Sequence, residues 1–215
     1  MIRKTVAVIA LGAITLATPA VAQSGFGLVG GFVSSNATID PPLGGLTASS
    51  RTGFAGGIAY TAKLSSNLVF APEAMYVMKG VDLSETVAGT AISVHEKLSY
   101  VEVPALLRYM FGMRGASLFV TAGPAISFKV SCKEEQTGIP GEPASQDCND
   151  PSNPNSGVKS SDVSVMFGAG VAVNRFAFSV RYDAGLSNVS NDVSANASTA
   201  KNKAILALVT ITFGR

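Results

Sequence analysis

The sequence has few of the residues that usually build metal centres. It contains no Trp, one His and two Cys among 215 residues, and only 14% of its residues are charged. A structural zinc site draws four ligands, mostly Cys and His, so this chain offers little material for one. We expect no metal ion and no other cofactor.

The N-terminus predicts export. Arg3 and Lys4 precede an uncharged apolar run, and an Ala-Val-Ala tripeptide then fits signal-peptidase cleavage before Gln23. The apolar run is shorter than the ~20 residues that a membrane-spanning helix needs. No Cys follows the cleavage site, which argues against a lipoprotein. We therefore expect a cleavable signal peptide at residues 1–22 and one mature domain at residues 23–215.

Neither charge sign predominates in the mature domain. The chain carries 16 basic and 14 acidic residues, and two of the basic residues, Arg3 and Lys4, lie in the predicted signal peptide. Binding to nucleic acid would require a basic face or stripe. We therefore expect no nucleic-acid partner.

A third absence concerns long apolar segments. Hydrophobic residues make up 47% of the chain, yet no apolar run beyond the signal is long enough to cross a bilayer as a helix. Only helices and closed β-barrels satisfy their backbone hydrogen bonds within lipid. A membrane β-barrel is therefore favoured, with a soluble secreted all-β domain as the alternative.

Segments with alternating side chains support the barrel. We identify eight of them: Phe26–Val33, Thr52–Lys63, Leu68–Lys79, Val94–Tyr109, Leu118–Val130, Val163–Asn174, Phe176–Leu186 and Ala204–Phe213. Eight strands are the smallest common size of a membrane barrel. The expected fold is all-β, an eight-stranded antiparallel up-and-down transmembrane β-barrel.

The connections between these segments alternate in length. Short links follow the second, fourth and sixth segments: Leu64–Asn67, Met110–Ser117 and Asn174–Arg175. Long polar links follow the first, third, fifth and seventh: Ser34–Arg51, Gly80–Ser93, Ser131–Asp162 and Ser187–Lys203. Bacterial outer-membrane barrels have short periplasmic turns and long outer loops. The pattern therefore indicates the cell outer membrane.

The faces of the last strand agree with a lipid-exposed exterior. Ile205, Val209 and Phe213 share one face, while Thr210 and Thr212 lie on the other. A soluble lipocalin-type barrel would show the reverse, with apolar residues inside. We expect this strand to pair with Phe26–Val33 and close the barrel, which removes the last open sheet edge.

Charged residues fall on predicted inward faces. They are Glu73, Glu102, Arg108, Arg181 and Asp183. Buried charges are costly unless paired, so we predict an ion-pair network in the lumen. Two roles stay open: structural filling of a narrow interior, or a path for an ion or small solute. The interior of an eight-stranded barrel is just wide enough for side chains, although inward glycines could leave some water-filled space.

Three prolines lie inside predicted strands: Pro72, Pro104 and Pro124. Proline cannot donate to a β-ladder, so each should mark a bulge or a missing hydrogen bond.

The segments around these prolines carry a family resemblance. They are Leu98–Tyr109 (LSYVEVPALLRY), Ala71–Tyr76 (APEAMY) and Ala122–Pro124 (AGP), with Arg181–Val189 (RYDAGLSNV) as a fourth motif. The set resembles the outer-membrane β-barrel domain of PorT-like and "porin family" proteins, over essentially the whole mature chain. The resemblance implies an eight-stranded outer-membrane barrel, inserted by the barrel-assembly machinery, and implies no catalytic residues.

The two cysteines, Cys132 and Cys148, fall in the third long link. In an oxidising compartment such a pair predicts one disulfide, and metal binding is the weaker alternative. The stapled loop is the best candidate for contact with an extracellular ligand or protein.

His95 has sequence neighbours that could form a catalytic set with it. Ser93, Glu96 and Ser99 are close in sequence, and Ser, His and a carboxylate form a nucleophilic set. His95 and Glu96, however, point to opposite faces of a strand, and Ser93-Val94-His95 reverses the His-x-Ser order of lipid A deacylases. We therefore expect a non-enzymatic outer-membrane barrel with an envelope-structural or surface-interaction role through its long loops. The alternative is a narrow pore or carrier for a restricted small solute.

Overall fold

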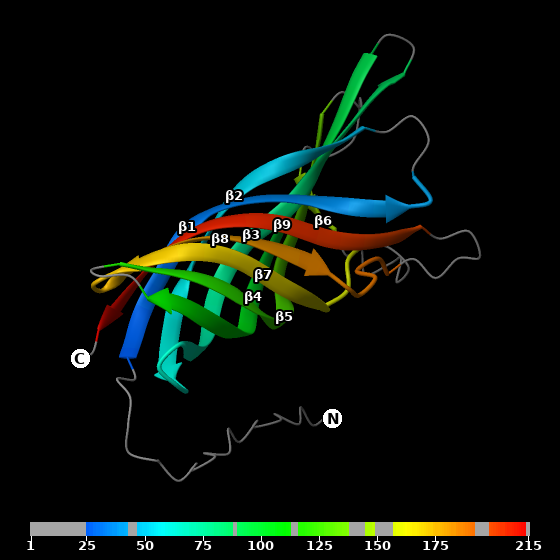
Figure 1. The fold of residues 1–215 in the computed structure, drawn as a ribbon. Coiled ribbons are helices and arrows are strands. Elements are labelled where there is room, and N and C mark those ends of the chain that lie inside the picture. The colour runs from blue at the N-terminus through cyan, green and yellow to red at the C-terminus, as the bar shows by residue number, and fades with distance from the viewer. Residues whose placement is uncertain are drawn as a thin grey trace, which may run out of the picture.

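The computed structural model is a β-sheet rolled into a barrel (Figure 1). It describes residues 25–42, 47–87, 90–112, 116–137, 145–148, 157–191 and 198–213. The predicted signal peptide lies outside these residues. Within them, no helix has the length and apolar character needed to cross a membrane.

Nine strands make up the described fold. They are β1 (Gly25–Asp40), β2 (Thr47–Lys63), β3 (Leu68–Val87), β4 (Thr90–Gly112), β5 (Ser117–Thr137), β6 (Ser145–Asp147), β7 (Ser161–Val173), β8 (Phe176–Gly185) and β9 (Thr199–Phe213). Eight form the ring, and the three-residue β6 is added to the edge of β5 beyond it. The eight-stranded all-β prediction is confirmed, whereas β6 was not foreseen.

All strand pairs are antiparallel, and two of them close the ring. β1 pairs with β9, with Phe26 opposite Phe213, and β4 pairs with β5. The predicted closure of the last strand on the first is therefore confirmed. Closure removes the unpaired backbone edge that an open sheet would expose.

The two faces of the wall differ as alternation requires. On β9, Ile205 and Phe213 are about half exposed, whereas Leu206 and Thr210 are buried. The same alternation makes Phe178 exposed and Arg181 buried on β8. Large apolar side chains thus cover the outside of the ring, as a lipid-facing surface requires.

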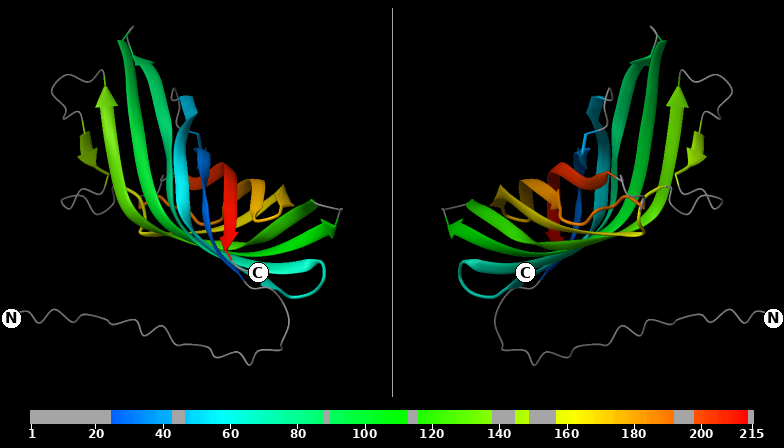
Figure 2. Two further views of the ribbon diagram at one scale, coloured as in Figure 1. Left: turned by 90° about the vertical axis from the view of Figure 1, so that its left-hand side faces the viewer. Right: turned by 90° about the vertical axis from the view of Figure 1, so that its right-hand side faces the viewer.

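The strands continue well beyond this apolar surface at one end. The β3–β4 hairpin rises furthest, and β5 with β6 stands beside it (Figure 2). The link Gly80–Ser93, predicted as a long loop, is paired strand as far as Val87 opposite Thr90. That prediction was wrong because polar strands outside lipid still satisfy their backbone groups by pairing with each other.

The prolines lie in unshifted register. Pro72 pairs with Ala105 and Pro104 with Ala125, and the register is the same on both sides of each. The register shifts recorded in the sheet lie instead between Ser50 and Ala55 and between Ser99 and Tyr100. The sequence predicted either a bulge or a missing hydrogen bond at each proline. The unshifted register excludes a bulge, so the consequence is the missing hydrogen bond, because proline has no N–H to donate.

Candidate functional site

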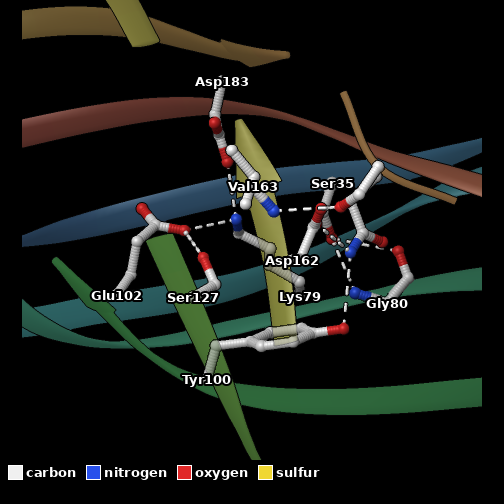
Figure 3. Close-up of polar contacts among 11 residues, drawn as sticks. Ser35, Lys79, Gly80, Tyr100, Glu102, Ser127, Asp162, Val163 and Asp183 are labelled. Atoms are coloured by element: carbon white, nitrogen blue, oxygen red, sulfur yellow. Dashed lines mark hydrogen bonds and ion pairs between the residues drawn. The ribbon is translucent and has the colours of Figure 1, made fainter. Parts of the chain in front are cut away.

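The barrel interior holds a cluster of buried charges. Lys79 on β3 lies between two carboxylates: its Nζ is 2.5 Å from Glu102 Oε2 on β4 and 2.6 Å from Asp183 Oδ2 on β8 (Figure 3). The Ser127 hydroxyl donates to the same Glu102 oxygen at 3.0 Å. One ammonium group therefore bridges opposite parts of the wall.

A second ion pair joins β8 to β3. Arg181 contacts Glu73 with both terminal nitrogens, at 2.6 and 2.9 Å. The exposed fractions of the two side chains are 0% and 1%. This two-pronged geometry is the strongest form of an arginine–carboxylate contact.

Arg108 is buried beside this pair but interacts differently. Its guanidinium carbon lies 4.3 Å from the centre of the Phe119 ring, a cation–π arrangement. Its Nε has no hydrogen-bond partner among the described residues. Glu73 and Arg181 are the charged groups that act on it.

The structure thus places all five predicted lumen residues in the interior and adds Lys79. Lys79 shares the inward parity of Glu73 on the same strand. The parity of the strand therefore signals an inward Lys79, although this last residue of the predicted segment Leu68–Lys79 is not among the five predicted lumen charges. With it, the buried charged side chains of the described residues are three cations (Lys79, Arg108 and Arg181) and four anions (Glu73, Glu102, Asp162 and Asp183).

Apolar side chains fill most of the remaining interior. They include Val33, Met75, Leu106, Met166 and Leu206, all at most 1% exposed. The predicted inward residues given above were charged residues, threonines and glycines, so the prediction described only part of the interior. The physical reason is that a narrow closed ring must be filled with side chains to reach native packing density.

Two inward glycines, Gly168 and Gly170, have neighbouring side chains where a Cβ would lie. A Cβ at Gly170 would lie 2.4 Å from the Phe119 ring, and one at Gly168 would lie 3.0 Å from Cγ of Arg181. These glycines leave room for the side chains that stack across the lumen. The interior is therefore a packed core.

Outside the lipid-facing zone, His95 takes part in a surface ion cluster. Its Nδ1 is 2.8 Å from Asp82 Oδ1, which also accepts a 2.8 Å bond from Arg51. Partial burial raises the pKa of Asp82, but the hydrogen bonds from His95 and Arg51 outweigh it and hold that pKa below its usual value. The imidazole contacts a carboxylate on the neighbouring strand, and no described hydrogen bond joins it to a serine hydroxyl.

The end of the barrel with the long strand extensions is called the outer mouth below. It contains a cavity of about 660 Å³. Its walls come from the outer ends of β1, β3, β4, β5 and β9, from β6 with Cys148, and from residues 157–158 and 189–190. At its floor, Asn202 donates to Asp162 at 2.8 Å and to the Tyr100 hydroxyl at 3.3 Å. Both tyrosine and aspartate lie beside Lys79 in Figure 3.

A disulfide braces this mouth. Cys132 and Cys148 are joined, with their Cα atoms 5.4 Å apart, so the predicted bond is present. Cys132 belongs to β5 and not to a loop, because β5 extends to Thr137. Glu96 lies close to both sulfurs, but cysteines in a disulfide offer no thiolate to a metal ion.

Comparison with known families decides the class of the protein. The model of the "Outer membrane protein beta-barrel domain" family matches residues 21–191. The chain belongs to this family. Its membership, with the closed ring and apolar exterior, places the domain in the outer membrane.

Solved structures of related architecture are more distant. Ail of Yersinia pestis, crystallised with the heparin analogue sucrose octasulfate, is 15% identical, covers 89% of this chain and 100% of its own, and gives a TM-score of 0.44. Neisserial surface protein A is 14% identical, covers 87% of this chain and 97% of its own, and gives a TM-score of 0.40. The N-terminal barrel of Pseudomonas aeruginosa OprF is 12% identical, covers 88% of this chain and 99% of its own, and gives a TM-score of 0.30. No curated protein matches the sequence.

Proposed function

We propose that the mature domain, residues 23–215, is a non-enzymatic outer-membrane barrel that acts at the cell surface through the outer ends of its strands. It would be exported by the cleavable segment 1–22 and inserted by the barrel-assembly machinery. The observation that carries the proposal is the ordered outer extension, in which β3, β4 and β5 run on past the lipid-facing zone.

Cross-strand contacts support this extension as a fixed platform. Arg51 on β2 and His95 on β4 both contact Asp82 on β3, and Lys97 on β4 pairs with Glu135 on β5. Exposed ion pairs of this kind each contribute little to the free energy of folding. Together with the continuous backbone ladder, they favour a pre-organised surface, and such a surface loses less conformational entropy on binding than a flexible loop does.

Trimming the β3–β4 hairpin tests the proposal. Residues 85–92 are replaced by Asn-Gly, so that Ser84 and Ser93, already paired, flank a two-residue turn of favoured geometry. We expect cells expressing the wild-type protein to adhere to polystyrene or to collagen, fibronectin or laminin coatings more than empty-vector cells. The trimmed variant should fall to the empty-vector level.

A control variant carries Ser65→Gly and Ser66→Gly in the short turn at the opposite end of the barrel. It should adhere like wild type, and all variants should migrate differently boiled and unboiled on a detergent gel. Equal adhesion of trimmed and wild-type cells, or no adhesion above empty vector, would contradict the surface role. Increased detergent sensitivity of cells lacking the protein, without an adhesion change, would instead support an envelope-structural role.

Electrical recording distinguishes the proposed packed barrel from the narrow-pore alternative. Glu102 and Lys79 are at most 2% exposed at the side chain, and apolar residues fill the space around them. We therefore expect no stable conductance steps in planar-bilayer recordings of the wild type. Stable steps whose size changes in Glu102→Ala or Arg108→Ala would support the pore instead.

A further inference from the structure

The cavity at the outer mouth has the size and character of a ligand site. Its volume of about 660 Å³ falls within the roughly 300–1,000 Å³ of typical small-molecule pockets. It lies at the end of the barrel where β3, β4 and β5 extend beyond the apolar surface. None of the lumen charges described above lines it.

The charged side chains in the cavity wall are all acidic. They are Glu96 on β4, Glu134 on β5 and Asp147 on β6. Lys129 acts on both Glu96 and Asp147 from β5, but it is not part of the lining, and its ammonium group donates to the Val158 carbonyl. The wall therefore presents a net negative charge to an occupant.

An oriented acceptor lies at the floor. Asn202 is 6% exposed, and both of its described side-chain hydrogen bonds use Nδ2. The contact with the Asp162 carboxylate fixes this orientation, because an ionised carboxylate only accepts. Neither of these bonds uses Oδ1 of Asn202, which can accept a hydrogen bond from a donor in the cavity.

Apolar side chains make up much of the rest of the lining. They include Val81 and Leu83 on β3, Leu98 on β4, and Val158 and Val189 from the links before β7 and after β8. Leu98, Val158 and Val189 also form a small core with Tyr100 and the disulfide. A wholly polar ion would leave this apolar surface in contact with water, so the lining suits a ligand with an apolar body.

We propose that the outer-mouth cavity binds a small organic cation, an ammonium group attached to an apolar body. The ammonium group donates to the carboxylates of Glu96 and Glu134 and to Asn202 Oδ1, and the apolar body packs against the valines and leucines. The inference deepens the proposed surface function and rests on it only in requiring that this mouth faces the exterior.

Binding of a matched probe series to the full chain in lipid nanodiscs tests the inference. The probes are 4-phenylbutylamine, the neutral 4-phenylbutan-1-ol and the anionic 4-phenylbutanoate, with empty nanodiscs subtracted to remove partitioning into lipid. We expect the amine to bind about tenfold more tightly than the alcohol, because hydrogen bonds to a carboxylate are charge-assisted. The carboxylate probe should bind least.

Two double variants locate the binding. Glu96→Gln with Glu134→Gln should abolish the preference for the amine. Asp40→Asn with Glu85→Gln removes the same charge from side chains outside the lining and should keep the preference. Undetectable amine binding, equal binding of amine and alcohol, or equal losses in the two variants would each overturn the proposal.

Two further readouts are specific to this site. Burial and the charge of Glu134 raise the pKa of Glu96 against the opposing effect of Lys129, so Glu96 loses its charge at a higher pH than an ordinary glutamate. Amine affinity should therefore fall as the pH drops from about 8 to about 5. Cys132→Ser with Cys148→Ser should also weaken amine binding while the barrel keeps its gel shift.

The hairpin-trimmed protein separates this inference from the proposed function. It keeps Val81, Leu83 and Glu96, so it should bind the amine while failing in adhesion. Adhesion that depends on the hairpin without any amine binding would overturn the cavity proposal alone. Amine binding without adhesion would overturn the adhesive role alone.

Discussion

Replacing Lys79 by methionine is expected to lower the free energy of unfolding by about 3–5 kcal/mol, the cost of leaving a buried charge without its partner. Lys79 is the only described cation in contact with Glu102 and Asp183. Its removal leaves two carboxylates facing each other inside the barrel. The chain has no Trp, so the folded fraction is best read across a urea series from the unboiled gel shift of protein in lipid vesicles.

Two matched variants isolate the charge effect. Lys63→Met removes an ammonium group from the exposed end of β2 and should leave the urea midpoint unchanged. Adding Glu102→Gln and Asp183→Asn to Lys79→Met should recover most of the loss, because neutral amides no longer repel. A wild-type midpoint for Lys79→Met, or no recovery in the triple variant, would refute the role of Lys79 as the central counter-charge.

Breaking the Arg181–Glu73 pair is the second large effect we expect, again about 3–5 kcal/mol for either single substitution. Glu73→Met should cost more than Arg181→Met. The reason is Arg108: without Glu73, two guanidinium groups face each other, whereas without Arg181 the glutamate still has Arg108 nearby. The measurement is again the urea midpoint of the vesicle-inserted protein.

A double-mutant cycle checks this pair. Glu73→Met with Arg181→Met removes both charges and should be more stable than Glu73→Met alone, because it leaves one buried guanidinium group without a counter-charge instead of two. It should be less stable than Arg181→Met, in which Glu73 still balances Arg108. Strict additivity of the single losses would show that the two side chains act independently. If Arg181→Met lost more stability than the Glu73 variant, the proposed influence of Arg108 would be disproved.

Local patterns in the sequence were sufficient for the ring. Alternation in Ala204–Phe213 and Phe176–Leu186 identified the outward and inward faces correctly because side chains on a strand alternate with period two. The same parity identified Glu73, Glu102, Arg108, Arg181 and Asp183 as inward-facing. It could not say which of them pair, since the partners of Asp183 and Glu73 lie on strands about a hundred residues away.

The outer end was less predictable for a physical reason. Polar segments such as Gly80–Ser93 have the composition of loops, and only pairing with a neighbouring strand makes them extended. The shift of Cys132 from loop to strand and the appearance of β6 follow from the same pairing. The mouth cavity could not be foreseen at all, because its lining comes from segments that meet only when the ring closes.

The sequence by itself therefore determined the class of fold, the inward and outward alternation of side chains in the wall, and the identity of most buried charges. It also determined that short turns lie at one end of the barrel and long links at the other. These follow from local periodicity and from the demand that backbone groups in lipid be satisfied. Tertiary structure decided how the interior is filled, that Lys79 balances two carboxylates, and that the outer strands enclose an acidic cavity. Those properties depend on register and closure between strands distant in sequence, which no local pattern encodes.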